Sequence, residues 1–150
     1  LDIDYDRYAA AEALLGWCNA KVSIDGKEPF QSSHIADAFL RGMAHTSVAH
    51  LKLTGLAPSG GRAALVRGET APSVDFSGVD APTNHAEWLI NARIEMSPDA
   101  LVQSLKNALA QAATPATVPK STKATIALIS RKMPCAAVKA GFQASPRVTP

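Results

Sequence analysis

Residues 87–99 read EWLINARIEMSPD and hold two strong signals of secondary structure side by side. In the first nine residues, apolar and mainly polar positions alternate, and this period of two predicts a strand with one buried face. The buried face would carry Trp88, Ile90, Ala92 and Ile94, and the other face Glu87, Leu89, Asn91, Arg93 and Glu95. The last three residues, Ser97 to Asp99, predict a helix start. Serine caps a helix, proline suits its first position, and an acidic side chain complements its positive end.

Apolar residues at helical spacing predict two helices. The stripe of the helix after residue 97 would consist of Leu101, Leu105, Ala108, Leu109 and Ala112. Thr114-Pro115 would end that helix. The other helix would carry Ile35, Ala38, Phe39, Gly42 and Met43 on its core face and end near His45 and Thr46. We expect Ser32 and Ser33 to cap it, since a hydroxyl can accept a hydrogen bond from an unpaired first-turn amide.

The period of two recurs at residues 17–24 and 49–54. The core faces of these strands would carry Cys18, Ala20, Val22 and Ile24 in the first, and Ala49, Leu51 and Leu53 in the second. Asp25-Gly26 would end the first strand with a turn. Residues 55–61 are rich in glycine and predict a hairpin loop leading to a returning strand at residues 63–66. A short strand at 74–76 and a last strand at 125–131 complete the prediction, with Ile126 and Leu128 opposite Ala127 and Ile129.

This order of elements predicts an α+β fold. Two split β-α-β units joined by a hairpin describe a ferredoxin-like sandwich, with a mainly antiparallel sheet and both helices on one face. One additional strand would lie between the two units along the sequence. We therefore expect one domain over residues 1–132. Residues 133–150 contain Pro134, Gly141, Pro146 and Pro150 and predict a weakly ordered tail.

The composition narrows the class of protein. The chain has 150 residues, of which 47% are hydrophobic and 19% charged, and its net charge is +2. These values favour a folded domain and argue against a nucleic-acid or membrane-surface protein. No apolar run approaches the roughly 18 residues of a membrane span, and no signal peptide is recognisable, so we expect a soluble, cytoplasmic protein. Because Leu1 is not a start methionine, we expect a piece of a longer reading frame or a trimmed chain.

The sequence contains no recognised catalytic motif. Gly60-Gly61 is followed by Arg62-Ala63, whereas a phosphate-binding loop needs lysine and then serine or threonine at these positions. Serine, histidine and aspartate occur, but no motif such as Gly-x-Ser-x-Gly arranges them. We therefore assign no catalytic residue and expect no cofactor.

Cysteine and histidine side chains leave a second hypothesis open, that of a small metal-binding carrier or enzyme. The candidate ligands are Cys18, His34, His45 and His50. Thiolate and imidazole groups suit zinc, but the spacing matches no standard zinc signature. We expect Cys18 to point into the core and His50 onto the opposite face of the sheet. No metal ligand is therefore assigned.

The face of the sheet that the helices leave open is the candidate binding surface. It would carry Trp17, Asn19, Lys21, His50, Lys52, Leu89, Asn91 and Arg93. Trp17 departs from the polar pattern, and large aromatic rings often anchor partners. A merely solvated face is the plain alternative, and residues 5–15, the tail or a second copy of the chain are others that would cover Trp17. Recognition of RNA would need paired stacking aromatics, and aromatic residues make up only 5% of the chain.

Three segments resemble the C-terminal domain of CobW-like GTPases. They are residues 5–20, YDRYAAAEALLGWCNA; the helix from His34 to Met43 leading into His50-Leu51-Lys52-Leu53; and the junction from residues 89–93, LINAR, to Leu101. The resemblance covers residues 5–112. In that family the small C-terminal domain follows a P-loop GTPase domain that handles metal or cobalamin delivery. The resemblance therefore implies an accessory role beside an upstream GTPase domain. This chain contains neither that domain nor the family's Cys-x-Cys-Cys motif, so GTP hydrolysis is carried over to no residue here.

The leading hypothesis is thus a non-enzymatic accessory or interaction domain that binds a partner or a small ligand through its open sheet face. An upstream GTPase domain is one expected partner, and a second copy of the chain is another. The metal-binding carrier and a plain oligomerisation module are the alternatives.

Overall fold

The computed structural model describes residues 14–44, 46–56, 60–69, 71–78, 80–113 and 123–132. Its strands are β1 (Gly16–Phe30), β2 (Val48–Gly55), β3 (Arg62–Val66), β4 (Ser73–Asp75), β5 (Thr83–Ile94) and β6 (Lys123–Lys132). Its helices are α2 (Ser32–Met43) and α3 (Pro98–Ala112). The predicted weakly ordered tail at 133–150 and the lead-in segment at 1–13 lie outside the described residues.

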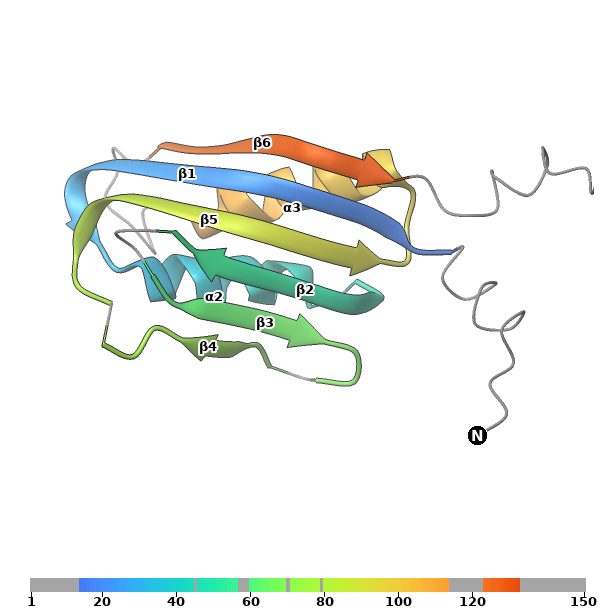
Figure 1. Cartoon of the computed structure of the whole chain (residues 1–150), viewed down its shortest axis with the longest axis horizontal. Coiled ribbons are helices and arrows are strands. Elements are labelled where there is room, and N and C mark those ends of the chain that lie inside the picture. Colours follow the sequence, from blue (N-terminus) through green and yellow to red (C-terminus); the bar gives the residue numbers. More distant parts are fainter. Residues whose placement is uncertain are drawn as a thin grey trace, which may run out of the picture.

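The strands form one sheet in the order β4-β3-β2-β5-β1-β6, and every neighbouring pair is antiparallel. Both helices pack on the same face of this sheet (Figure 1). The units β1-α2-β2 and β5-α3-β6 are the two split β-α-β units of a ferredoxin-like sandwich, so the predicted α+β fold class is confirmed. The sheet continues beyond β2 with β3 and β4, so two strands, rather than the one additional strand predicted, extend the ferredoxin-like core at one edge.

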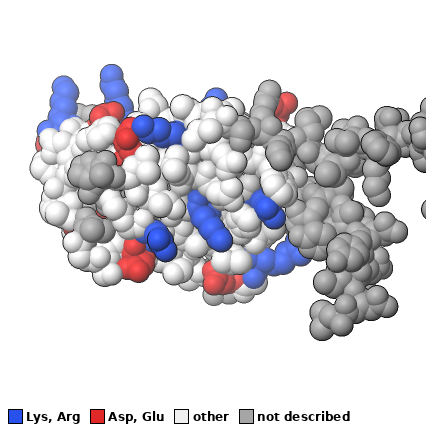
Figure 2. All heavy atoms as spheres, viewed as in Figure 1, with Lys and Arg blue, Asp and Glu red and all other residues white. Residues whose placement is uncertain are grey.

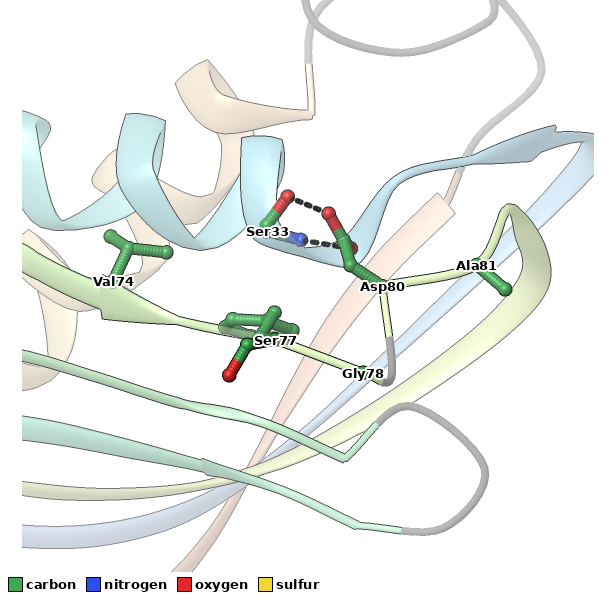
Figure 3. A pocket seen from close by; sticks show the side chains of 7 residues that line it. Ser33, Val74, Ser77, Gly78, Asp80 and Ala81 are labelled. Atoms are coloured by element: carbon green, nitrogen blue, oxygen red, sulfur yellow. Dashed lines mark hydrogen bonds between the residues drawn. The ribbon is translucent and has the colours of Figure 1, made fainter.

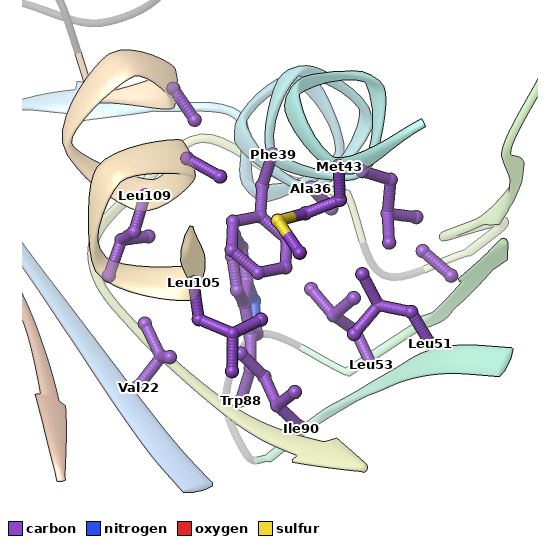
Figure 4. Close-up of a cluster of buried hydrophobic side chains, with 14 of the residues drawn as sticks. Val22, Ala36, Phe39, Met43, Leu51, Leu53, Trp88, Ile90, Leu105 and Leu109 are labelled. Carbon is purple, nitrogen blue, oxygen red and sulfur yellow. The ribbon is translucent and has the colours of Figure 1, made fainter. Parts of the chain in front are cut away.

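The core lies between the helices and the sheet (Figure 4). Phe39 and Met43 from α2 and Leu105 and Leu109 from α3 point towards the strands, where they meet Trp88 of β5. All five residues of the predicted α3 stripe are buried, which confirms that helix and its orientation.

Of the described helices, none combines the length and apolarity needed to cross a lipid bilayer.

The two helices begin in different ways. At α3 the prediction is confirmed, because the Ser97 hydroxyl accepts a hydrogen bond from the Ala100 amide at 3.3 Å. At α2 the predicted serine cap is wrong. Gln31 holds the cap position without a side-chain hydrogen bond, and Ser32 is buried. The Asp80 carboxylate accepts hydrogen bonds from both the amide and the hydroxyl of Ser33. A side chain from a distant loop therefore pairs with an amide of the first turn that has no partner within the helix.

Two strands depart from simple alternation. The turn predicted at Asp25-Gly26 is wrong, since β1 continues to Phe30, which is buried and pairs with Thr83 after a shift in register. In β2 a register shift follows Val48, so Val48 takes the buried position predicted for Ala49. In β2 the shift inserts one extra residue, as in a β-bulge, whereas in β1 the pairing with β5 resumes at Phe30 after a longer irregular stretch.

The predicted hairpin between β2 and β3 is confirmed. Gly55 lies so close to the chain returning from the loop that a Cβ atom there would overlap the carbonyl oxygen of Gly60. Glycine is therefore required for the close approach of the two backbones at the base of this loop.

Candidate functional site

The structure brings all the predicted binding residues onto one face of three adjacent strands. We call the eight residues Trp17, Asn19, Lys21, His50, Lys52, Leu89, Asn91 and Arg93 the open-face block. Across β1, β5 and β2 they align in three rows, Trp17–Arg93–His50, Asn19–Asn91–Lys52 and Lys21–Leu89–Thr54. Because α2 and α3 pack on the opposite face, the helices leave this block uncovered (Figure 1).

In the first row, a cation lies over an aromatic ring. The guanidinium carbon of Arg93 is 3.6 Å from the centroid of the Trp17 ring. This distance is well within the range of a cation–π interaction. Trp17 is half-buried, so the ring presents only part of its surface, and the contact with Arg93 helps to hold it in position.

A side-chain network links His50 of the first row to Asn91 and Asn19 of the second row and so runs across all three strands. The distance from His50 Nε2 to Asn91 Oδ1 is 2.7 Å, and Asn91 Nδ2 donates to Asn19 Oδ1 at 2.5 Å. Since an amide oxygen only accepts, His50 Nε2 carries the hydrogen in this pair. The network fixes the orientation of the Asn91 amide. Alternation predicts which residues share the face but not this network.

The third row ends in an ion pair. Lys21 Nζ lies 2.6 Å from Glu87 Oε1, and this hydrogen bond is the main cause that lowers the pKa of Glu87 from its ordinary 4.5. His85 stands next to the pair, with its Nδ1 2.7 Å from Asp25 Oδ1. The charged side chains at this end of the face are thus largely paired with one another.

Between the second and third rows lies a hollow of about 450 Å³, which we call the Leu89 hollow. It spans β2, β5, β1 and β6, and its lining includes Lys52, Thr54, Leu89, Asn19, Asn91 and Ile129. Ile129 is 61% exposed and Leu89 is 39% exposed. The predicted site did not include Ile129. The alternation in residues 125–131 had nevertheless placed Ile129 on the other face of the strand from Ile126 and Leu128.

Figure 2 shows the charges on this side of the molecule. Several lysine and arginine side chains stand across the middle of the face, and the acidic side chains lie nearer its edges. Most of the surface between them is uncharged. The face therefore combines a scattered positive charge with neutral and apolar area.

The three candidate metal ligands that the structure describes, Cys18, His34 and His50, are not brought together. Cys18 points into the core, where burial raises the pKa of its thiol, whereas His50 belongs to the opposite face of the sheet. His34 is exposed on α2, and His45 lies outside the described residues. In the part of the chain that the structure describes, no three histidine, cysteine or acidic residues form a group that could hold a metal ion.

A second hollow, of about 570 Å³, lies at the start of α2 (Figure 3). Its lining includes Ser33, Phe76, Ser77 and Asp80. Ser33 and Asp80 point towards each other and form the hydrogen bonds that begin the helix. Asp80 is thereby engaged in holding the loop before β5 against α2, which is a structural role.

Comparisons with known proteins add little to this geometry. No protein-family model matches the chain, and no curated protein matches it significantly. Among solved structures, the chain is similar to a hydantoinase/carbamoylase family amidase from Burkholderia ambifaria, with a TM-score of 0.43 and 15% sequence identity. The match covers 79% of this chain and 28% of the amidase, so the chain spans less than a third of that protein. A similarity of this strength carries no information about activity. What the structure defines is a class of fold, an α+β ferredoxin-like sandwich with one open sheet face.

Proposed function

We propose that this chain is a non-enzymatic accessory domain that contacts a partner protein through the open-face block. We further propose that the partner is a GTPase domain of the CobW-like kind, as the sequence resemblance implies, and that the two act in the cytoplasm. The main observation in support of the proposal is the open-face block. It is a continuous set of side chains from three strands, aligned in register and left uncovered by both helices.

The state of these side chains supports a binding role. Trp17 is held by Arg93, and Asn91 is held by His50 and Asn19. Side chains that are already ordered lose less conformational entropy when a partner binds, so more of the contact energy appears as affinity. Tryptophan and arginine are also enriched among the residues that dominate binding at protein interfaces.

The proposal is tested by first determining the reading frame upstream of Leu1. A P-loop together with a Cys-x-Cys-Cys motif is the expected finding. The GTPase domain so identified is then added to the ¹⁵N-labelled chain, and amide shifts are recorded. We expect shifts at Asn19, Leu89 and Asn91, with α2 and α3 unchanged.

A matched pair of variants locates the contact. Leu89→Glu places a charge in the middle of the block and should abolish binding, whereas Gln103→Glu places the same charge on the exposed face of α3 and should not. An upstream frame without a P-loop would remove the GTPase domain as partner. Shifts confined to the helices would overturn the role of the open face.

A further inference from the structure

The Leu89 hollow differs from the rest of the open-face block in its charge. Among the described residues that line it, one is charged, Lys52, and none is a carboxylate. The remaining side chains that line it are the amides of Asn19 and Asn91, the hydroxyl of Thr54 and the aliphatic groups of Leu89 and Ile129, whereas the side chain of Ile90 is buried on the other face of the sheet. A site with one cation, polar groups at its edge and an aliphatic floor is complementary to a carboxylate attached to an apolar body.

Lys52 differs from its charged neighbours because its side chain has no partner within the described residues. Lys21 is paired with Glu87, and Arg93 stacks on Trp17. Further along the same face, Arg62 lies close enough to Asp75 to contribute to lowering the pKa of that carboxyl, after the larger effect of the Ser77 hydrogen bonds. The Lys52 ammonium is exposed and free to pair with an incoming anion.

The aliphatic part of the hollow is unusually exposed for a sheet surface. Leu89 and Ile129 come from strands on either side of β1, and both retain a large fraction of their surface in solvent. Burying aliphatic surface contributes about 25 cal/mol per Å². A guest that covers both side chains would therefore gain affinity from apolar contact in addition to any ion pair.

We infer that the Leu89 hollow receives an acidic side chain of the partner protein, flanked by an aliphatic residue, with the carboxylate paired to Lys52. This inference rests on the proposed function and specifies the chemistry of the partner. A protein segment is favoured over a small free acid because the hollow crosses four strands, roughly 14 Å at ordinary strand spacing, and is continuous with the block. That length suits a peptide with several side chains.

The test uses the full ¹⁵N-labelled chain and three probes. The first is the peptide acetyl-Leu-Glu-Leu-Glu-Leu-amide, the second is the same peptide with glutamine for glutamate, and the third is hexanoate. We expect the glutamate peptide to shift the amides of Leu89, Asn91 and Ile129. We also expect it to bind about two- to five-fold more tightly than the glutamine peptide, as an exposed ion pair allows.

Two variants of equal net charge make the test specific. Lys52→Met should abolish the preference for glutamate over glutamine. Lys106→Met removes a positive charge from the exposed side of α3 and should leave the preference intact. Retention of dispersed amide signals shows that each variant is folded.

Each contrary outcome has a definite meaning. Equal affinities for the two peptides, or equal losses in the two variants, would overturn the assignment of a carboxylate to Lys52. Hexanoate binding at the same amides as tightly as the glutamate peptide would make the hollow a small-acid site and overturn the protein segment. If the GTPase domain shifts the open-face block while Lys52→Met leaves its affinity unchanged, this inference fails and the proposed function stands. If that domain produces no shifts, the proposed function fails.

Discussion

The indole nitrogen of Trp88 donates a hydrogen bond to the hydroxyl of Ser32 at 2.9 Å, and both residues are buried. This bond joins β5 to the first turn of α2 across 56 positions of sequence. It gives the largest side chain of the core a polar partner that it would otherwise lack.

We predict that Ser32→Ala lowers the free energy of unfolding by about 1–3 kcal/mol, because the Trp88 N–H would then be buried without an acceptor. Urea unfolding followed by tryptophan fluorescence measures the change. In a Trp88→Phe background, Ser32→Ala should cost clearly less, and an equal cost in both backgrounds would show that this hydrogen bond does not stabilise the fold.

A second prediction concerns the loop that begins α2. Asp80→Ala removes the acceptor of both Ser33 hydrogen bonds and should lower the free energy of unfolding by about 1 kcal/mol, the usual effect of losing a helix cap. Asp37→Ala removes only an exposed ion pair with Arg41 and should cost clearly less than Asp80→Ala. Equal stabilities of the two variants in chemical denaturation would contradict the role given to Asp80.

The Lys21–Glu87 pair predicts a pH dependence of stability. Because the pKa of Glu87 is lowered in the folded state, its contribution is present above the ordinary pKa of 4.5 and is lost as the pH falls through the lowered value. The difference in unfolding free energy between the wild type and Glu87→Gln should therefore be largest near neutral pH and vanish in acid. A difference that grows on acidification would refute the assignment.

The contact between Arg93 and Trp17 predicts a change in fluorescence. Arg93→Gln removes the cation above the ring, so acrylamide should quench the emission of Trp17 more strongly. Arg41→Gln, on the exposed side of α2, should leave quenching unchanged.

Light scattering tests whether Trp17 takes part in self-association. We expect Trp17→Ala to have the same molar mass as the wild type. A lower mass would place Trp17 in an interface between copies of the chain.

The positions of the candidate metal ligands predict the result of metal analysis. Since Cys18 and His50 lie on opposite faces of the sheet, they do not bind the same ion. We expect protein purified without a histidine tag to contain zinc or cobalt well below one equivalent, and His50→Ala to leave that content unchanged. A stoichiometric metal that is lost in His50→Ala would restore the carrier hypothesis.

Much of the fold could be predicted from local pattern alone. Alternation in residues 17–24 and 87–94 is strong because each strand has one buried face, and together with residues 49–54 it correctly placed all eight residues of the open-face block on one face. The register shifts after Asp25 and Val48 could not be predicted, since they depend on pairing with β5, which is distant in sequence. Turn chemistry at Asp25-Gly26 was overridden by the burial of Phe30.

The contacts within the site were less predictable than its location. The network of His50, Asn91 and Asn19 depends on register between strands that are distant in sequence. The roles of Ser32 and Asp80 likewise depend on partners about 50 positions away. Which molecule the open face binds, and the kinship with CobW-like proteins, remain predictions, because alternation indicates where a side chain lies but not what it meets.

The three-residue strand β4 has a consequence for the behaviour of the protein at high concentration. A sheet edge offers unpaired N–H and C=O groups to other chains and is a starting point for aggregation. At this end of the sheet the last strand is only Ser73–Asp75 and carries a carboxylate, so it offers a very short template. The two strands added to the ferredoxin-like core, β3 and β4, therefore end the sheet in a short edge that disfavours aggregation by strand addition on that side.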